Sequence, residues 1–242
     1  MAMNTQDITP SHIAIIPDGN RRWAIEHKLP VIEGHRRGYE KIIKIIKHLR
    51  QLGIPTVTVW AFSVDNWKRS RNEVNSLMKM FELFIGQHLK DAVKNQVKLT
   101  HIGRKDRLPD SLKRKIIEAE EKTSKFSKYY LNIAVDYSGR DEIVRAVDKV
   151  SSIKFQVSSE KYQDSNITEK DINDNLDLAG QPHPNPDIII RTGKEVRLSG
   201  FMIWQSQYSE LFFPDKYFPD FKETDIDIIL EEYRIRQRRF GK

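Results

Sequence analysis

The segment Asp18–Arg22, of sequence DGNRR, places a carboxylate, an amide and two guanidiniums next to one another. It follows the short apolar run Ile13–Ile16, which is typical of a strand buried in a parallel sheet and which Pro17 and Gly19 end. In open α/β sheets, ligands bind at the carboxyl ends of the strands. A carboxylate beside two arginines suits a metal-bridged phosphate or diphosphate. We therefore expect an anion site here; the alternative is a surface turn with solvated charges.

Polar clusters follow three further predicted strands, at Phe62–Arg69, Asp136–Arg140 and Arg191–Ser199. Because the carboxyl ends of parallel strands share one edge of the sheet, these clusters predict a common pocket. The arginines and the serine of the last cluster would form a fork for a second phosphate group. His35 opens a helix soon after the first cluster, and a helix start favours an anionic partner. The alternative interpretation is that these loops are polar only because loops generally are.

Several classes of function are excluded or disfavoured by composition. The chain of 242 residues has no cysteine, so it has no disulfide, thiolate metal site or cysteine nucleophile. It lacks the GxxxxGK[ST], GxGxxG, HExxH and GxSxG signatures. The net charge of +7 permits acidic partners, but the basic residues are spread along the chain, so we expect no nucleic acid partner. No apolar run reaches the ~18 residues of a membrane span, and the start lacks the apolar centre of a secretory signal, which favours a cytoplasmic protein.

Short β-type runs alternate with longer amphipathic patterns along the chain. The predicted strands cover residues 13–16, 56–62, 97–103, 130–135, 187–191 and 209–213. The predicted helices cover residues 34–52, 73–93, 109–122, 140–150, 168–176 and 225–239. This alternation predicts a single α/β domain over residues 1–242, with a central six-stranded, mainly parallel sheet flanked by helices. We expect residues 1–11 and the polar loop 153–166 to be flexible.

Taken together, the polar clusters resemble the cis-prenyltransferase family, which includes undecaprenyl diphosphate synthase. The matching motifs run in order through nearly the whole chain: DGNxRWA at 18–24, GHxxG at 34–38, AFSxxNWxR at 61–69 followed by Glu73, LNIA at 131–134, YxGR at 137–140, PDxxIRTG at 186–193, and RxSxFxxWQ at 197–205 followed by Tyr208 and Glu210. The resemblance implies an undecaprenyl diphosphate synthase-like fold with an apolar tunnel. It also implies a Mg²⁺-dependent prenyl transfer, in which isopentenyl diphosphate is added repeatedly to an allylic diphosphate, typically farnesyl diphosphate, with each new double bond cis.

The resemblance assigns roles to individual residues. Asp18 is expected to hold Mg²⁺ on the allylic diphosphate, and Glu210 to complete the metal site from a neighbouring strand or a neighbouring subunit. Asn66, with Ser63, is expected to assist removal of the proton after condensation. The remaining residues expected to bind or enclose the substrates are Gly19, Asn20, Arg21, Arg22, Trp23, His35, Phe62, Trp67, Arg69, Glu73, Arg191, Arg197 and Ser199. The resemblance further implies a homodimer, with peripheral membrane contact through its lipid product.

Several positions depart from the family pattern, namely Pro17, Arg21, Val31, Val196 and Gly200, and two of them bear directly on the site. Arg21 replaces a frequent glycine, and Val196 stands where some members have a metal-binding histidine, so Asp18 and Glu210 would have to suffice for the metal. We expect a medium or long product, because Ala61 is small and nothing obvious plugs the tunnel. The alternatives are a short-chain or branched (head-to-middle) prenyl diphosphate synthase, a non-catalytic binding subunit on the same fold, and a basic nucleic-acid-binding protein.

Overall fold

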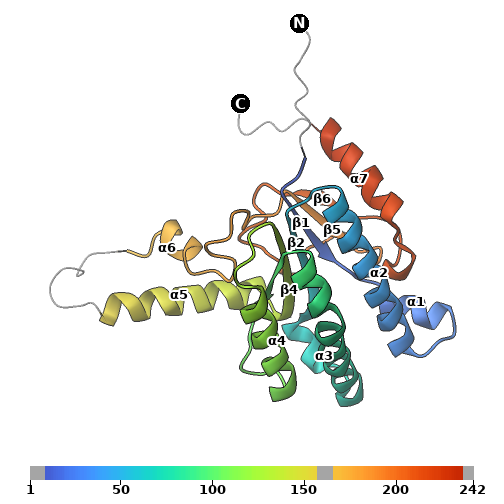
Figure 1. The fold of residues 1–242 in the computed structure, drawn as a ribbon, viewed down its shortest axis with the longest axis horizontal. Coiled ribbons are helices and arrows are strands. Elements are labelled where there is room, and N and C mark those ends of the chain that lie inside the picture. Colours follow the sequence, from blue (N-terminus) through green and yellow to red (C-terminus); the bar gives the residue numbers. More distant parts are fainter. Residues whose placement is uncertain (1–8, 157–165, 237–242) are drawn as a thin grey trace, which may run out of the picture.

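A computed structural model describes residues 9–156 and 166–236 of the chain. Six strands form one sheet in the order β3-β4-β2-β1-β5-β6, and every neighbouring pair is parallel. Helices pack around this sheet, and α5 extends away from the body on the side opposite α1 and α7 (Figure 1). The predicted α/β domain with a six-stranded sheet is confirmed, and the sheet is parallel throughout.

The strands are β1 (His12–Ile16), β2 (Thr56–Ser63), β3 (Val97–Ile102), β4 (Tyr129–Tyr137), β5 (Ile188–Arg191) and β6 (Glu210–Phe212). The helices are α1 (Asn20–Glu26), α2 (Val31–Gln51), α3 (Arg71–Lys94), α4 (Asp110–Thr123), α5 (Gly139–Gln156), α6 (Glu169–Asn173) and α7 (Glu223–Ile235). Two short 3₁₀ helices, η1 (Val64–Lys68) and η2 (Phe218–Asp220), complete the described part of the chain.

Strand β1 lies at the centre of the sheet, and all of its residues are buried. Successive side chains of a strand point to opposite faces. Accordingly, Ile13 and Ile15 join the core beneath α2 and α7, whereas Ala14 and Ile16 join the core on the other face. Strand β2 lies on one side of β1 and β5 lies on the other, so the order in which strands are added to the sheet switches sides at β1. Such a switch leaves a crevice at the carboxyl ends of the central strands.

Some predicted boundaries are wrong, for identifiable reasons. The segment 153–166 is not a loop throughout, because α5 continues to Gln156; residues 157–165 lie outside the described part. Of the predicted flexible start, residues 1–8 lie outside the described part, whereas Pro10 is buried and Ser11 donates its backbone N–H to Asp187. Neither α1 nor η1 was predicted, since both are short and largely polar.

Helix α6 begins with a capping box. Its N-cap is Thr168, whose hydroxyl accepts the backbone N–H of Asp171 at 3.2 Å, while the Asp171 carboxylate accepts the backbone N–H of Thr168 at 2.9 Å. This reciprocal pair satisfies two backbone donors that the first turn would otherwise leave open. Among the residues that the structure describes, no helix combines the length and the apolar character needed to cross a membrane.

Candidate functional site

The chain turns sharply after β1 and then enters α1. Gly19 has a φ of 99°, and a Cβ added there would lie 2.5 Å from Cδ1 of Tyr217, so this turn requires glycine. Helix α1 begins directly afterwards, so Asn20–Arg22 form the first turn of a helix. Only Trp23 and Ala24 of this helix are buried, which is too short a pattern for sequence periodicity to reveal.

Asp18 lies where the ends of β1, α1 and β5 meet. Its Oδ1 accepts hydrogen bonds from the backbone N–H of Gly19 at 2.6 Å and from Arg22 Nη2 at 3.2 Å. Its Oδ2 accepts a hydrogen bond from Arg191 Nη2 at 2.8 Å. The Thr192 hydroxyl donates to the backbone carbonyl of Asp18 at 2.8 Å. A carboxylate is therefore held between two guanidiniums at the crevice of the sheet, and its side chain keeps an exposed fraction of 31%.

Arg191 organises the loop that follows β5. Its buried guanidinium donates Nη1 to the backbone carbonyl of Arg197 at 2.6 Å and to Ser199 Oγ at 2.7 Å. Glu195 in the same loop pairs with Arg197 at 2.5 Å and with Arg22 of α1 at 2.8 Å. The loop therefore brings the buried Arg191 guanidinium to the Ser199 hydroxyl, whereas the Arg197 side chain is 61% exposed and pairs with Glu195.

The end of β2 contributes a second polar wall. In the following 3₁₀ helix η1, Asn66 Oδ1 accepts the backbone N–H of Ser63 at 3.1 Å. The Trp67 ring meets that of Phe62 edge to face, with centroids 5.2 Å apart, and its indole N–H donates to Asp136 at 2.8 Å. Because Asn66 Oδ1 already accepts a hydrogen bond, its amide NH₂ group is the part suited to a phosphate oxygen.

Glu73, in the first turn of α3, lies beside two arginines and a histidine. Its carboxylate pairs with Arg69 at 3.1 Å, with Arg21 at 3.4 Å and with His35 Nε2 at 3.6 Å. Burial, and next the positive charge of Arg69, lower the pKa of the His35 ring below its ordinary value. The Arg21 side chain is 57% exposed and also lines the cavity described below. Arg21, which stands where the family frequently has glycine, therefore pairs with α3 at the rim of the site.

Two glycines of α2 allow α1 to pack directly against it. A Cβ on Gly34 would lie 2.1 Å from the backbone oxygen of Asn20, and one on Gly38 would lie 2.2 Å from Asn20 Oδ1. Both distances are far below normal contact, so residues larger than glycine would displace Asn20. The Asn20 amide NH₂ also donates to the Pro17 carbonyl at 3.0 Å, which ties the start of α1 to the end of β1.

These elements enclose a polar cavity of about 240 Å³ at the carboxyl edge of the sheet. The predicted site residues that line it are Asp18, Gly19, Asn20, Arg21, His35, Phe62, Ser63, Asn66, Arg69, Arg191 and Ser199. Arg22, Trp67, Glu73 and Arg197 do not line it but contact residues that do. Three of the four predicted polar clusters, together with His35, therefore converge on one cavity, whereas no residue of Asp136–Arg140 lines it.

Two predicted site residues lie elsewhere. The Trp23 indole donates to Asp220 at 2.9 Å and its side chain is buried between α1 and η2, so it packs α1 in place. Glu210 pairs with Arg236 at 2.5 Å and lies opposite Ile188 at the start of β5, whereas Asp18 follows the other end of the sheet. A neighbouring strand of the same chain therefore does not bring Glu210 to Asp18, and that part of the expectation is wrong.

Sequence reasoning missed residues that hold the site together. Glu195 links the arginines of α1 and of the β5 loop, and Thr192 binds the backbone of Asp18. The Tyr217 ring lies under the Arg22 guanidinium, 5.6 Å from centroid to Cζ. An acidic residue between basic ones was a visible signal for Glu195. Nothing in the sequence placed Tyr217 there, because it is distant in the chain and no motif contains it.

An apolar passage begins beside the polar cavity. A second cavity of about 100 Å³ shares Asn20, His35 and Ala61 with it and continues between α2, α3 and the sheet. Phe84 lines this cavity and two further apolar cavities of about 50 Å³ each, one toward α4 and one toward the far ends of α2 and α3. The Phe84 ring meets Tyr39 edge to face at 4.7 Å. Where a tunnel is expected, the apolar space between the sheet and its helices is therefore divided into three separate cavities that share Phe84 as a wall.

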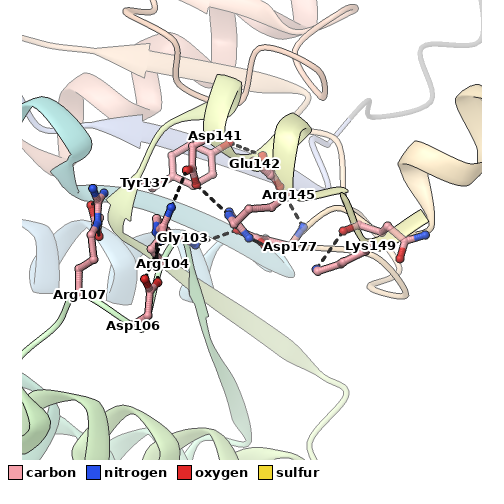
Figure 2. Close-up of polar contacts among 12 residues, drawn as sticks. Gly103, Arg104, Asp106, Arg107, Tyr137, Asp141, Glu142, Arg145, Lys149 and Asp177 are labelled. Atoms are coloured by element: carbon pink, nitrogen blue, oxygen red, sulfur yellow. Dashed lines mark hydrogen bonds and ion pairs between the residues drawn. The ribbon is translucent and has the colours of Figure 1, made fainter. Parts of the chain in front are cut away.

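A buried polar network supports the other side of the site, at the corner between β4 and α5. Glu142 is 1% exposed and accepts hydrogen bonds from Tyr137 at 2.5 Å and from Gln205 at 3.1 Å. Burial raises the pKa of the Glu142 carboxyl. Asp177 donates its backbone N–H to Glu142 and pairs with Arg145 at 2.6 Å, and Figure 2 shows these side chains side by side. The network fixes the segment that leads from Ser199 to β6.

Comparisons with known proteins agree with this geometry. The prenyltransferase family model, which describes undecaprenyl diphosphate synthases, matches residues 16–241. The chain is 44% identical over 237 residues to a tritrans,polycis-undecaprenyl-diphosphate synthase (geranylgeranyl-diphosphate specific) of Pyrococcus horikoshii, covering 97% of this chain and 88% of the relative. It is 40% identical over 235 residues to a ditrans,polycis-undecaprenyl-diphosphate synthase ((2E,6E)-farnesyl-diphosphate specific) of Micrococcus luteus, covering 96% and 91%.

A solved structure is also similar over the whole chain. It is lavandulyl diphosphate synthase from Lavandula x intermedia in complex with dimethylallyl diphosphate, with a TM-score of 0.91 and 37% identity, covering 98% of this chain and 100% of that one. With a family match over nearly the full length and a polar cavity that adjoins an apolar one, this chain belongs to the undecaprenyl diphosphate synthase family of prenyl transferases.

Proposed function

We propose that this enzyme extends an allylic diphosphate, with farnesyl diphosphate as the primer, by successive cis additions of isopentenyl diphosphate to give a medium or long polyprenyl diphosphate. The observation that carries the proposal is the junction of the two cavities. A cavity lined by Asp18, Arg21 and Arg191 lies against an apolar cavity lined by Phe84, and the two share lining residues that include His35 and Ala61. A molecule with a diphosphate at one end and a hydrocarbon chain at the other fits that junction.

The two diphosphates are proposed to bind on opposite sides of Asp18. The backbone of Gly19 and Asn20, with Arg21 and Arg22, would hold the allylic diphosphate at the mouth of the apolar passage. On the β5 side, Arg191, Arg197 and Ser199 would hold isopentenyl diphosphate, since two guanidiniums and a hydroxyl are strong donors to phosphate oxygens. Asn66, which lines the cavity from η1, would donate its amide to a diphosphate oxygen and so orient the group that loses a proton.

The Asp18 carboxylate, together with oxygens of a substrate diphosphate, would hold Mg²⁺. Mg²⁺ is commonly held by one or two carboxylates, substrate phosphates and water. Asp18 is partly exposed at the cavity, while within residues 9–156 and 166–236 no group of three or more acidic or histidine side chains forms a complete protein site. When bound, Mg²⁺ would neutralise charge on the departing diphosphate. The chain itself would orient the two diphosphates with its arginines and exclude water from the apolar passage.

We further propose a homodimer, a cytoplasmic location and peripheral membrane contact through the lipid product. The support for the dimer is the position of Glu210. Its side chain is 29% exposed at the edge of the sheet opposite Asp18, so a metal site that uses both carboxylates needs a second copy of the chain. Sedimentation analysis would test the dimer directly.

The decisive experiment is a product assay. The purified protein is incubated with farnesyl diphosphate, radiolabelled isopentenyl diphosphate and Mg²⁺, and the dephosphorylated products are sized by chromatography. We expect a series of products longer than one addition. Asp18→Asn should lower turnover at least about 100-fold, because it removes a charge at the reacting centre. Asp215→Asn is the control, since Asp215 is 86% exposed and pairs only loosely with Lys194 at 3.8 Å.

The main competing function is a short-chain or head-to-middle synthase. The similarity to lavandulyl diphosphate synthase favours considering it, as does the division of the apolar passage into small cavities at Phe84. A product that stops after one condensation, or that is branched, would reject repeated elongation. Unchanged turnover in Asp18→Asn would reject the proposed site itself.

A further inference from the structure

Asp136, at the end of β4, is a fully buried carboxylate that the reaction does not use directly. Its exposed fraction is 0%, and it does not line the polar cavity. An isolated buried charge is costly, so a buried carboxylate needs close partners. Arg107, in the loop between β3 and α4, supplies them: its Nε donates to Oδ2 at 2.8 Å and its Nη2 to Oδ1 at 2.5 Å.

The same carboxylate reaches the site through Trp67. The indole N–H of Trp67 donates to Asp136 Oδ1 at 2.8 Å, so this oxygen receives both the indole and the guanidinium. The backbone of Asp136 is also held, because its carbonyl accepts the N–H of Arg104 at 3.1 Å. The position of Oδ1 is thus determined from the β3–α4 loop, and the position of Trp67 is determined by Oδ1.

Trp67 matters because η1 has little else to hold it. None of the five residues of η1 is buried, so apolar packing does not fix this short helix. Its side-chain attachments to the body of the fold run through Trp67, which contacts the Phe62 ring and binds Asp136. Asn66 precedes Trp67 directly, and Ser63 caps the same helix. Both line the polar cavity, so a shift of the indole would move them relative to a bound diphosphate.

We propose that the Arg107–Asp136 pair is a positioning device that docks η1 through the Trp67 indole and so places Ser63 and Asn66 for the reaction. The inference rests on the proposed prenyl transfer for its kinetic consequence, whereas the docking of Trp67 is a property of the folded protein alone. Arg107 and Asp136 are positioning residues, since neither touches the cavity.

The chain offers a matched control within the same loop. Arg104 pairs with Asp106 at 2.7 Å and with Asp141 at 3.5 Å (Figure 2), so its guanidinium is directed to carboxylates other than that of Asp136. Arg104→Gln therefore removes a surface ion pair, whereas Arg107→Gln leaves a buried carboxylate without its cation. The double variant Arg107→Gln/Asp136→Asn removes the unpaired charge and keeps an amide oxygen that can accept the indole N–H.

The experiment combines kinetics with the spectrum of the indole. The Trp67 indole N–H signal is assigned in ¹H–¹⁵N spectra by its loss in Trp67→Phe. At a temperature well below unfolding, we expect Arg107→Gln to shift or broaden that signal, to lower kcat about 10-fold and to raise KM for isopentenyl diphosphate. We expect Arg104→Gln to change none of these, and the double variant to recover the signal and most of kcat.

Two results would overturn the proposal. One is an Arg107→Gln protein that melts at a lower temperature but keeps the wild-type indole signal, kcat and KM, because its role would then be stability alone. The other is a double variant as impaired as Arg107→Gln. If the wild-type protein transfers no prenyl group at all, the proposed function fails, and the indole signal of Arg107→Gln still decides whether the pair docks η1.

Discussion

Replacing Gly34 of α2 by alanine should disturb both the stability and the site. The added Cβ would lie 2.1 Å from the backbone oxygen of Asn20 and 3.0 Å from Ala24 Cβ, so α1 must move by about 1 Å to relieve the overlap. Overpacking of this kind costs typically about 1–3 kcal/mol, and the gain in helix propensity from Gly to Ala offsets about 0.5–1 kcal/mol. We expect Gly34→Ala to lower the free energy of unfolding by about 1 kcal/mol, the midpoint of the difference between these two ranges.

Alanine substitutions at two other glycines provide a comparison for the expected loss of stability. At Gly38 the clashing atom is the Asn20 side-chain oxygen, which can rotate, so the loss of stability should be smaller while Asn20 still leaves its place. At Gly86 of α3 the nearest atom is Lys115 Nζ, 3.8 Å away, so Gly86→Ala should stabilise the protein by about 0.5–1 kcal/mol.

Thermal unfolding and turnover measure the two effects separately. For a chain of this size about 1 kcal/mol corresponds to about 2–4 °C in Tm, so Gly34→Ala should melt about 2–4 °C lower. A displacement of about 1 Å near the reacting centre can cost up to about 100-fold in rate, so kcat/KM should fall in Gly34→Ala and Gly38→Ala and stay unchanged in Gly86→Ala. Equal Tm and equal kcat/KM in all three variants would refute the close packing of α1 on α2.

Three further predictions concern pH, product length and the rim of the site. Burial lowers the pKa of His101 to about 4, so the ring stays neutral in the folded protein, whereas in the unfolded chain it binds a proton below its ordinary pKa of about 6.5. The free energy of unfolding should therefore fall by up to about 3 kcal/mol as the pH drops from about 6.5 to about 4. Urea titrations of His101→Gln at several pH values should lack this part of the decline. Phe84→Ala should join the three apolar cavities and lengthen the product in the sizing assay. The control is Leu83→Ala, which truncates an exposed neighbour and should leave the product length unchanged. Identical product lengths in the two variants would show that Phe84 does not limit the length of the prenyl product. Because Arg21 pairs with Glu73 at the exposed rim, Arg21→Ala should change the free energy of unfolding by less than about 0.5 kcal/mol but raise KM for the allylic diphosphate; an unchanged KM would place Arg21 outside the binding site.

Much of the fold follows from features that act over short distances in the sequence. Strand β1 is readable because Ile13–Ile16 is an uninterrupted apolar run, and α2 because its buried residues recur with helical spacing. Helix α1 was missed because its sequence, NRRWAIE, holds only two buried residues, and its start depends on the left-handed turn at Gly19.

The site was predicted as far as motifs and strand ends allow. Asp18, Arg191 and Ser199 converge as expected, because they follow adjacent parallel strands. Trp23 and Glu210 belong to the same motifs yet lie outside the cavity, and a motif alone does not show which side of an element a residue occupies. Contacts such as Glu195 with Arg22 join segments far apart in the chain, so only the folded structure reveals them.

The bridging position of Glu195 links the two halves of the cavity. In the structure this carboxylate is shared between Arg22, on the α1 side, and Arg197, on the β5 side. A diphosphate that draws Arg22 away leaves Glu195 paired with Arg197 alone, and that pairing competes more strongly with a second diphosphate. The two ligands would therefore bind with negative thermodynamic coupling, and by reciprocity each would weaken the other by the same factor. Replacing Glu195 by glutamine should make the two binding events independent in titration calorimetry with inorganic diphosphate and substrate.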